Sequence, residues 1–390
     1  MSKAMSKAMP TVTHDQIIEA LRPVEDPELH RSIVDLGMVR DIKIDKHGKI
    51  DVQIALTVAG CPLRNEIQNR VGGAVTQVPG VTGFALDFTV MTDQERADLR
   101  EKLHGHSHAP ANGGQAHGHA EGKAVPFNEP GNKTRPLLIS SGKGGVGKSS
   151  VTVNLAVALA SQGYKVGVVD ADIYGYSVPR MLGTDRDPVV IDEMLVPPSA
   201  HGVSCISIGY FVPEGQAVIW RGPMLHKALE QFLADVFWDN PDFLLIDMPP
   251  GTGDIALSLS QYLPRGEVYV VTTPQPAAQK VAALSAAMAA KVNLTVKGVI
   301  ENMSYFVGDD GKRYEVFGSG GGQALADDLG VPLLGQLPLV TELREGGDTG
   351  NPITVANPDS ELAQSFQAIA SRIATELKSK KIFSSALKVN

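Results

Sequence analysis

Cysteine is scarce in this sequence, which contains only Cys61 and Cys205 among its 390 residues. Two cysteines so far apart exclude a disulfide framework and are typical of a reducing compartment, so we expect a cytoplasmic protein. A continuous apolar run of about 18 residues, the usual minimum for a membrane span, is also missing. The N-terminal segment contains lysines without an apolar core, which is not the pattern of a secretory signal.

Positive charge is not in excess either: 35 lysines and arginines against 43 aspartates and glutamates give a net charge of −8. A general nucleic-acid-binding protein is normally basic overall, so we expect no nucleic-acid partner. The remaining composition, 43% hydrophobic and 20% charged, is typical of a globular protein with a sizeable core. The length allows more than one domain.

The composition changes sharply near residue 104. Residues 104–133 are rich in glycine, alanine, histidine and proline and contain little that a core could bury, which predicts a flexible linker. Half of the ten histidines of the chain lie in it: His104, His106, His108, His117 and His119. Metal binding by this tract is the alternative interpretation, because imidazole is a common metal ligand.

Residues 11–103, before the linker, are predicted to form a small α+β domain, because helical and strand-like patterns follow one another within the usual size of a domain. A helix is expected to start near Thr13 or Asp15. Two strands are expected around the turn at Gly48, and another strand over 83–90.

Residues 134–380, after the linker, show short apolar runs that alternate with helical stretches. Apolar strands without polar alternation are typical of a parallel sheet buried on both faces. The alternation of strands and helices therefore predicts a doubly wound α/β domain. Its last helix is expected to have Asn357 as N-cap and Pro358 in the first turn. The stripe expected to be buried consists of Leu362, Phe366, Ile369 and Ile373.

Residues 142–149, Gly-Lys-Gly-Gly-Val-Gly-Lys-Ser, match the phosphate-loop pattern G-x-x-x-x-G-K-[ST] between a predicted strand and a predicted helix. Glycines let backbone N–H groups converge on phosphate oxygens, and the helix N-terminus adds positive potential. We therefore predict a P-loop NTPase domain in which Lys148 contacts the β- and γ-phosphates of ATP and Ser149 ligates Mg²⁺. The residues predicted to contact the nucleotide are Gly142, Lys143, Gly144, Gly145, Val146, Gly147, Lys148, Ser149 and Ser150.

Aspartates follow two of the predicted strands. Asp247 ends one apolar strand and is expected to hold the Mg²⁺ shell together with Ser149. Asp170 and Asp172 end another, and Asp172 is the candidate for positioning the attacking water or accepting its proton. Helix capping is the alternative role for all three. The glycine-containing loop 251–254 is expected to respond to the γ-phosphate.

The motifs "KGGVGKSS", "VVDADIYGYS" and "LLIDMPPGTGD" together resemble the deviant Walker A ATPases of the MinD/ParA group. In that group the second lysine of the loop, here Lys143, crosses a dimer interface to the partner's nucleotide. Within the group, "DADIYGYSVPRMLG", "RGPMLHKALEQFL", "ENMSYF" and "GSGGGQALA" resemble the Mrp/ApbC family of iron–sulfur cluster carriers over residues 134–380. The leading domain, with "VEDPELHRSIVDLGMV" and "TVAGCP", is similar to the SufT/PaaD-like domain.

The resemblance implies an ATPase that works as a homodimer and transfers or helps to assemble iron–sulfur clusters. Its partners would be assembly proteins or apo-client proteins, and its catalytic residues would be Lys143, Lys148 and Asp172. It also implies that Asn302 contacts the adenine base; a turn-forming role beside Glu301 is the alternative.

The sequence departs from the family pattern where a Cys-x-x-Cys pair usually follows the "ENMSYF" segment. Residues 308–311 are Gly-Asp-Asp-Gly, which predicts a hairpin turn between short strands. Three interpretations stay open. A [4Fe–4S] cluster is held elsewhere, the protein assists assembly without binding a cluster, or it is a related ATPase with another client, such as a MinD/ParA-like positioning or scaffold ATPase.

Cys61 is the candidate cluster ligand. We expect it to open a helix with Pro62 in the first position, and a helix N-terminus favours the thiolate form; a buried structural cysteine is the alternative. Cys205 lies in an apolar run and is expected in the core. The basic C-terminal tail would suit a membrane-binding helix, but a solvated terminus is favoured, so membrane binding is not expected.

Overall fold

The computed structural model describes residues 12–58, 63–104, 124–129, 131–173, 175–212, 222–251 and 254–377. The chain divides into two compact units, Met1–His119 with Val189–Val196, and Ala120–Pro188 with Pro197–Asn390. Part of the predicted linker belongs to the second unit, because Pro126–Asn128 form the short helix η1 and Phe127 is buried there. Residues 105–123 of the predicted linker lie outside the described residues.

The first unit has the predicted α+β character. Its helices are α1 (His14–Leu21), α2 (Arg64–Val75) and α3 (Asp93–His104), and its sheet contains β1 (Val39–Ile44), β2 (Lys49–Leu56) and β3 (Gly83–Val90). β2 pairs antiparallel with β1 and parallel with β3. Thr13 caps α1 in a capping box with Gln16, as its position in the sequence predicts. The hairpin of β6 (Val189–Ile191) and β7 (Met194–Val196) is also part of this unit.

The predicted start of the second helix is wrong. α2 begins at Arg64 with Leu63 as N-cap, two residues after the expected position of Pro62. Proline is tolerated in the first turn of a helix but does not fix where the helix begins. Cys61 itself lies outside the described residues. It precedes the first helical residue by three positions, which weakens the expected effect of the helix N-terminus on its thiol, since that effect falls off within one turn.

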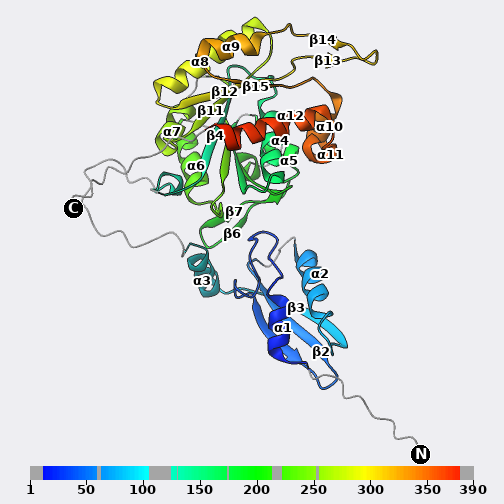
Figure 1. Cartoon of the computed structure of the whole chain (residues 1–390). Coiled ribbons are helices and arrows are strands. Elements are labelled where there is room, and N and C mark those ends of the chain that lie inside the picture. Colours follow the sequence, from blue (N-terminus) through cyan, green and yellow to red (C-terminus); the bar gives the residue numbers. More distant parts are fainter. Residues whose placement is uncertain are drawn as a thin grey trace, which may run out of the picture. The chain divides into compact units, whose positions relative to one another are not determined.

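The second unit is built on an eight-stranded sheet with the order β15-β12-β11-β4-β10-β5-β9-β8 (Figure 1). The strands are β4 (Arg135–Ser141), β5 (Val166–Asp170), β8 (Ser199–Ala200), β9 (Val203–Ser207), β10 (Phe243–Asp247), β11 (Glu267–Thr272), β12 (Thr295–Glu301) and β15 (Leu333–Gln336). All neighbours pair in parallel except β8 and β9. The predicted doubly wound parallel sheet is therefore confirmed.

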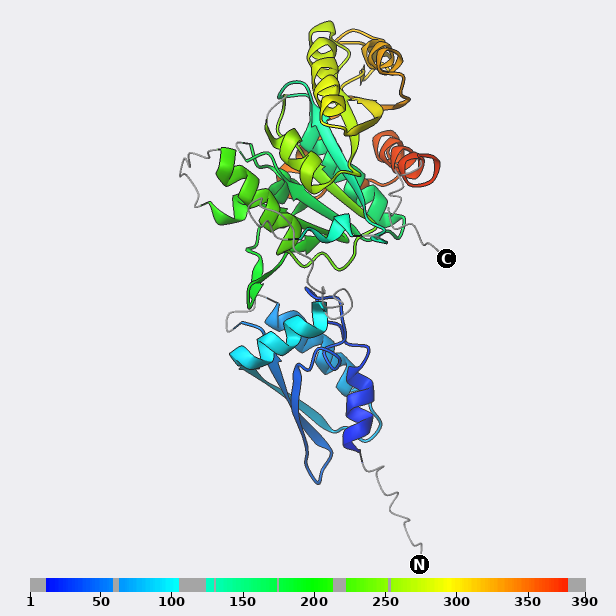
Figure 2. The ribbon, with the colours of Figure 1, turned by 90° about the vertical axis from the view of Figure 1, so that its left-hand side faces the viewer.

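Helices cover both faces of this sheet (Figures 1 and 2). One face is covered by α4 (Lys148–Ser161), α5 (Val178–Leu182), α10 (Thr341–Thr349), α11 (Ile353–Ala356) and α12 (Glu361–Ser371). The other face is covered by α6 (Gly222–Ala234), α7 (Asp254–Tyr262), α8 (Pro276–Lys291) and α9 (Gly321–Leu329). α4 is buried along almost its whole length, which explains why apolar residues occur on every side of it. None of the described helices is both long and apolar enough to cross a bilayer.

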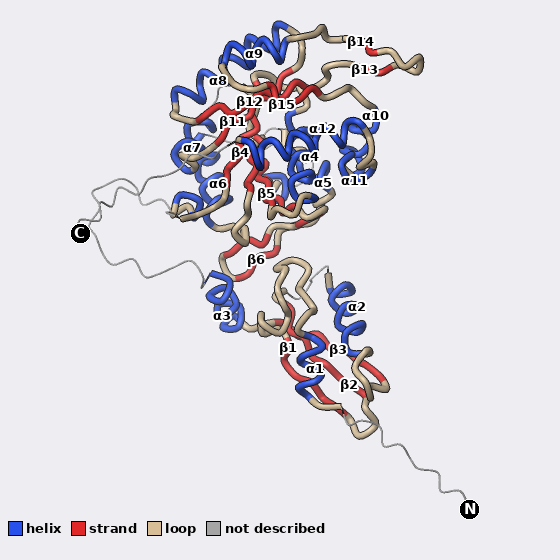
Figure 3. The backbone as a smooth tube through the Cα atoms, viewed as in Figure 1, coloured by secondary structure: helices blue, strands red, loops and turns tan. Residues whose placement is uncertain are grey.

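Two local predictions near the end of the chain have different outcomes. Residues 308–311 form the predicted turn between β13 (Phe306–Val307) and β14 (Arg313–Tyr314), the small hairpin visible in Figure 3. The predicted cap of the last helix is wrong, because α12 begins at Glu361 and the Ser360 hydroxyl accepts the N–H of Ala363 at 3.2 Å. Asn357 instead ends α11. The predicted buried stripe is confirmed, with Ile373 in the following π-helical turn η3 (Arg372–Glu376).

Arg135 fixes the last described segment, the turn η3 and Leu377, to the sheet. Its guanidinium makes a 2.7 Å ion pair with Glu267, which is 1% exposed, and donates to the carbonyls of Ile373 and Leu377. Arg135→Ala is expected to lower the free energy of unfolding by about 3–5 kcal/mol, because the buried carboxylate loses its cation. Urea denaturation followed by tryptophan fluorescence measures this unit, since both tryptophans, Trp220 and Trp238, belong to it.

The matched control is Lys133→Ala. Lys133 makes an ion pair of the same length, 2.7 Å, with Asp242, but its own side chain is 63% exposed. An exposed pair of this kind contributes about 0–1 kcal/mol. Equal losses in the two variants would contradict the assignment of Arg135 as a buried anchor.

Candidate functional site

The predicted phosphate loop lies at the carboxyl ends of three adjacent strands. The loop of residues 142–147 connects β4 to α4, and Asp247, the last residue of β10, pairs in register with Ile139 of β4 and Asp170 of β5. After β4 the chain first forms β5, β9 and β10 on one side of β4, and then β11, β12 and β15 on its other side. The carboxyl ends of the strands next to β4 are therefore the topological switch point of the sheet. Ligands bind at such switch points in open α/β sheets.

Two glycines of the loop are required for different reasons. Gly147 is the N-cap of α4 with φ +79°, and a Cβ there would lie 2.2 Å from Nδ2 of Asn302. A side chain at position 147 is therefore excluded by conformation and by space. A Cβ on Gly142 would lie 2.3 Å from the backbone N of Ala282, so Gly142 allows α8 to pack closely against the loop. The sequence pattern assigned Gly142 to phosphate binding and did not reveal this packing role.

The loop encloses a hollow of about 190 Å³. The hollow is lined by the predicted loop residues from Lys143 to Ser150, by Asp172, and by Ser141, Ser177, Met181 and Pro250. Backbone N–H groups of the loop and the N-terminus of α4 supply the positive potential that a phosphate needs. The residues present therefore fit the phosphates of a nucleotide.

Lys148 is the centre of a buried polar network. Its Nζ lies 2.7 Å from Oδ2 of Asp247 and 3.6 Å from Oδ2 of Asp172. Ser149 Oγ donates to the same Asp247 oxygen at 2.6 Å, and Thr152 Oγ1 donates to Oδ1 of Asp247 at 2.6 Å. The structure thus brings together all four predicted residues from three elements and adds Thr152, which the motif did not identify. The available signal was a hydroxyl one helical turn after Lys148, on the same side of the helix.

The two aspartates after β5 differ in their surroundings. Asp172 is partly exposed beside Lys148, and burial raises the pKa of its carboxyl, an effect that the Lys148 ammonium opposes. A raised pKa makes a carboxylate a better proton acceptor near neutral pH. Asp170 is fully buried and accepts hydrogen bonds from Ser207 Oγ and from the backbone N–H of Asp172. Burial and the neighbouring Asp247 raise the pKa of Asp170 to about 7.

The raised pKa of Asp170 predicts a pH dependence of stability. The folded protein retains the proton of Asp170 up to about pH 7, whereas the unfolded chain releases it near 3.8. The folded state therefore binds more protons in this window, so stability falls as pH rises through it. Asp170→Asn cannot titrate. The free energy of unfolding of the nucleotide-free variant, minus that of the wild type, is expected to be larger at pH 8 than at pH 5.

This difference is measured by urea denaturation at the two pH values. Asp328→Asn, an exposed position in α9, is the control for the loss of one carboxylate. A difference between variant and wild type that is the same at both pH values would contradict the assignment of a retained proton to Asp170.

Three further residues that the sequence predicted for the site, Lys143, Asn302 and Ser150, lie around the phosphate loop. The ammonium of Lys143 is half-buried and donates to Oε1 of Gln275 at 3.1 Å. The buried amide of Asn302 donates to the carbonyl of Val146 at 2.9 Å, while its own Oδ1 has no partner among the described residues. Ser150 Oγ lies 4.0 Å from the sulfur of Met181. Adenine contact by Asn302 stays a prediction; the observed contact supports the loop.

The loop after β10 is hydrogen-bonded to the end of β4 and to α8. The N–H of Gly251 donates to the carbonyl of Ser141 at 2.9 Å, and the carbonyl of Gly251 accepts the Ser285 hydroxyl at 3.3 Å. Thr252 and Gly253, which were predicted to respond to the γ-phosphate, lie outside the described residues. The described start of this loop is therefore in contact with both the phosphate loop and α8.

Cys205, the cysteine that the structure describes, does not form a cluster site. Cys205 is fully buried in β9, as predicted, and burial raises the pKa of its thiol far above the ordinary value. A neutral buried thiol is a poor metal ligand. No group of three or more histidine, cysteine, aspartate or glutamate residues in the described ranges is arranged to hold a metal ion. Cys61 stays a candidate by sequence alone.

Two family models match the chain. The model of the NUBPL iron-transfer P-loop NTPases matches residues 132–374, and that of the iron–sulfur cluster assembly proteins matches residues 14–84. Both matches fall on the units that the structure separates, the first on the phosphate-loop sheet and the second on the α+β unit.

Curated proteins and a solved structure are also similar. An iron–sulfur cluster carrier protein of Mycobacterium tuberculosis is 46% identical over 91% of this chain and 92% of its own length. That of Bacillus subtilis is 40% identical over 84% of this chain and 88% of its own. The structure of a nucleotide-binding protein from Archaeoglobus fulgidus in complex with ADP has a TM-score of 0.50 and 33% identity, covering 60% of this chain and 93% of that one.

Proposed function

The chain belongs to the NUBPL family of iron-transfer P-loop NTPases, and from this premise we propose that it is an ATP-hydrolysing carrier or assembly factor for iron–sulfur clusters. It acts in the cytoplasm as a homodimer that changes state with its nucleotide, and it serves assembly proteins or apo-client proteins. The resemblance to cluster carriers that the motifs indicated is confirmed by the family match. The observation that carries the proposal is the complete phosphate site around Lys148 in a chain that matches cluster carriers over nine-tenths of its length.

The residues around Lys148 have distinct roles in this function. The Lys148 ammonium, now paired with Asp247, would move to phosphate oxygens when ATP binds, since these are also anionic. Ser149 Oγ and the Asp247 carboxylate supply the hard oxygen ligands that Mg²⁺ prefers, and bound Mg²⁺ would neutralise charge on the β- and γ-phosphates. Asp172 orients the attacking water or accepts its proton.

Lys143 is assigned to the partner's nucleotide. A lysine supplied across an interface stabilises the charge of the transferring phosphoryl group as an arginine finger does, and it couples hydrolysis to dimerisation. In the single chain this ammonium is instead bonded to Gln275 of the same chain, at 3.1 Å. Lys143 must leave Gln275 before it can act on the partner subunit, so this hydrogen bond opposes dimerisation.

Gln275→Ala is expected to tighten the ATP-dependent dimer. A hydrogen bond from a charged donor such as this half-buried ammonium contributes about 1.5 kcal/mol, the low end for bonds that involve a charged group, and a symmetric dimer breaks two of them. The dimer Kd should therefore fall by about a hundredfold, measured by sedimentation in a non-hydrolysable ATP analogue. Gln275 precedes α8 without a side-chain capping bond, so alanine removes no helix cap.

Gln275→Glu is the control variant in which the dimer Kd is expected to change in the opposite direction. A carboxylate holds the ammonium more strongly than an amide does, so the dimer Kd should rise. In a Lys143→Ala background neither change should alter the Kd further, because the bond no longer exists. Shifts of the same sign in the two variants would contradict the competition between Gln275 and the partner subunit.

Anaerobic reconstitution with iron and sulfide tests cargo binding. The wild type and Cys205→Ala are expected to develop the visible absorption of a thiolate-bound cluster, because Cys205 is buried and neutral. Cys61→Ala is expected to lose it. Transfer is then measured as cluster-dependent activation of an apo-acceptor protein, with and without MgATP.

The outcomes separate the carrier from its alternatives. Absorption that persists in Cys61→Ala would remove the candidate ligand. A colourless wild type that still activates the acceptor with MgATP would indicate an assembly factor without a bound cluster. A colourless wild type that hydrolyses ATP but activates no acceptor would contradict the proposed function and favour a positioning or scaffold ATPase.

A further inference from the structure

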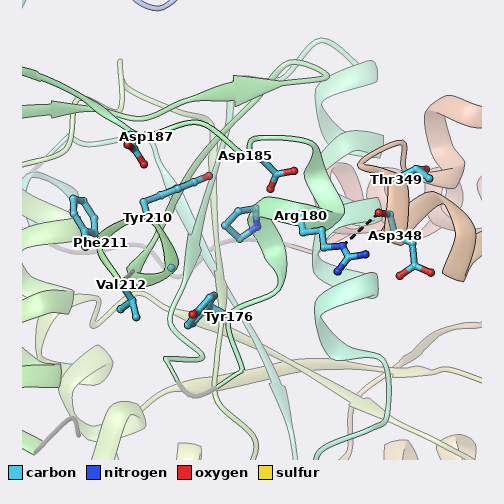
Figure 4. Close-up of a pocket in the computed structure, with 11 residues that line it drawn as sticks. Tyr176, Arg180, Asp185, Asp187, Tyr210, Phe211, Val212, Asp348 and Thr349 are labelled. Carbon is cyan, nitrogen blue, oxygen red and sulfur yellow. Dashed lines mark hydrogen bonds between the residues drawn. The ribbon is translucent and has the colours of Figure 1, made fainter. Parts of the chain in front are cut away.

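A large pocket lies beside the phosphate loop and has no assigned role. It measures about 890 Å³ and belongs to the second unit. Its walls come from the segment around α5, from the short helix η2 (Ile208–Phe211) that follows β9, and from the end of α10 (Figure 4). These segments are distant in the sequence, so only the fold brings them together.

The charged groups of this pocket are mainly acidic. Asp185, Asp187 and Asp348 line it with a single cation, Arg180, which leaves a charge of −2 (three carboxylates and one guanidinium). Asp348 is paired with Arg344 at 2.8 Å. Asp185 and Asp187 are exposed and make no hydrogen bond or ion pair with any residue that the structure describes. Two carboxylates of the pocket therefore have no partner among the described residues.

Aromatic rings form the rest of the surface. Tyr176 is 40% exposed, and its ring packs so closely on Gly209 that a Cβ there would lie 2.6 Å from it. Phe211 is 47% exposed although its ring stacks on Phe232 at 6.2 Å between centroids. In Figure 4 Asp185 and Asp187 line one edge of the pocket and Tyr176 lies across from them. Rigid exposed aromatic rings beside unpaired charge are typical of protein-binding surfaces.

The pocket shares a wall with the nucleotide site. Tyr176, Pro179 and Arg180 face the 890 Å³ pocket, whereas Ser177 and Met181 line the phosphate hollow. One side of the five-residue helix α5 thus faces the 890 Å³ pocket, and its other side faces the phosphate hollow. A displacement of α5 by nucleotide would change the shape of the pocket, and the coupling must be reciprocal.

We propose that this pocket binds a basic segment of a partner protein. The segment places basic side chains, arginine or lysine, against Asp185 and Asp187 and lays their stems or guanidinium planes on Tyr176 and Phe211, where cation–π attraction adds to the ion pairing. Nucleotide binding controls this site through α5. This nucleotide control rests on the proposed function, because it makes the partner a client whose capture and release follow the ATP cycle.

The experiment uses the full chain and a fluorescein-labelled peptide, Gly-Ser-Arg-Leu-Arg-Ser-Gly, in fluorescence anisotropy. The matched probe replaces both arginines by citrulline, which has nearly the same shape without the charge. The wild type is expected to bind the arginine peptide at least tenfold more tightly than the citrulline peptide. Asp185→Asn with Asp187→Asn should abolish this preference, whereas Asp328→Asn with Asp359→Asn, the same charge change on exposed positions elsewhere, should keep it.

Three results would overturn the proposal. They are equal affinity for the two peptides, an unchanged preference in the Asp185/Asp187 double variant, and binding that occurs only after deletion of residues 378–390. The last result would identify the occupant as the chain's own basic tail and not as a partner protein.

Nucleotide control has a separate readout. The affinity for the arginine peptide is expected to differ at least threefold between the ADP state and the non-hydrolysable ATP state. Lys148→Ala should keep peptide binding and lose this difference. Peptide binding without any nucleotide effect in the wild type would refute the role of α5. Unchanged ATP hydrolysis in Lys148→Ala would instead refute the proposed function.

Discussion

Replacing Lys148 by alanine is expected to abolish ATP hydrolysis, with a loss of about 10³-fold or more in kcat/KM. Lys148 is the cation nearest to both Asp247 and Asp172, at 2.7 and 3.6 Å, and its side chain is only 5% exposed. Without it, the phosphate site keeps two carboxylates and loses the ammonium that compensates them. Nucleotide affinity should fall as well, because anionic phosphates would then approach uncompensated carboxylates.

Steady-state phosphate release and the binding of a fluorescent ATP analogue measure the two effects. Since Asp247 is fully buried, its loss of a cation also lowers stability, so folding is checked by tryptophan fluorescence at the assay temperature. Lys148→Arg retains a charge for Asp247 but not the shape of an ammonium, and it should fold like the wild type and remain inactive. Hydrolysis near the wild-type rate in a folded Lys148→Ala protein would exclude the assigned phosphate site.

Replacing Asp172 by asparagine is expected to lower kcat by about 10²–10⁴-fold while ATP binding remains. The side chain is nearly isosteric, and the affected step is the handling of the attacking water. Removing a carboxylate 3.6 Å from Lys148 also reduces the competition for that ammonium, so ATP affinity should be unchanged or higher. Under these conditions the ATP-bound dimer should accumulate.

The combination of a slow kcat with retained ATP binding distinguishes Asp172 from Lys148. It is measured by single-turnover hydrolysis together with sedimentation in ATP. Asp328→Asn provides the same change of charge on the exposed surface of α9 and should leave both readouts unaltered. If Asp172→Asn loses ATP binding as completely as Lys148→Ala does, its role is structural and a different group must handle the water.

Much of the phosphate site could be predicted because its information is local. The strand before the loop, the loop motif and the helix after it occupy one continuous segment, Arg135 to Ser161, and parallel strands place their carboxyl ends at one edge. Asp247 and Asp172 were therefore found from strand ends alone. The helix boundaries at Pro62 and Asn357 were wrong, because several residues near each end are compatible with a first turn and packing selects among them.

Other parts of the site could not be predicted, because they join residues that are remote in the sequence. Gln275, which holds Lys143, is 132 positions away from it. The need for glycine at 142 arises from the backbone of α8, and the position of Asn302 arises from its bond to Val146. No local pattern encodes such contacts, since they depend on how the helices pack on the sheet.

The sequence by itself determined the fold class, the phosphate-loop motif and the family, because these follow from residue types at fixed short spacings. Only the tertiary structure decided that Asp170 retains a proton, that Lys148 pairs with Asp247, and that the Lys143 ammonium is bonded to Gln275. It alone formed the acidic aromatic pocket against α5. The physical reason is that desolvation, ion pairing and cavity shape depend on distances between side chains, and those distances exist only after the chain has folded.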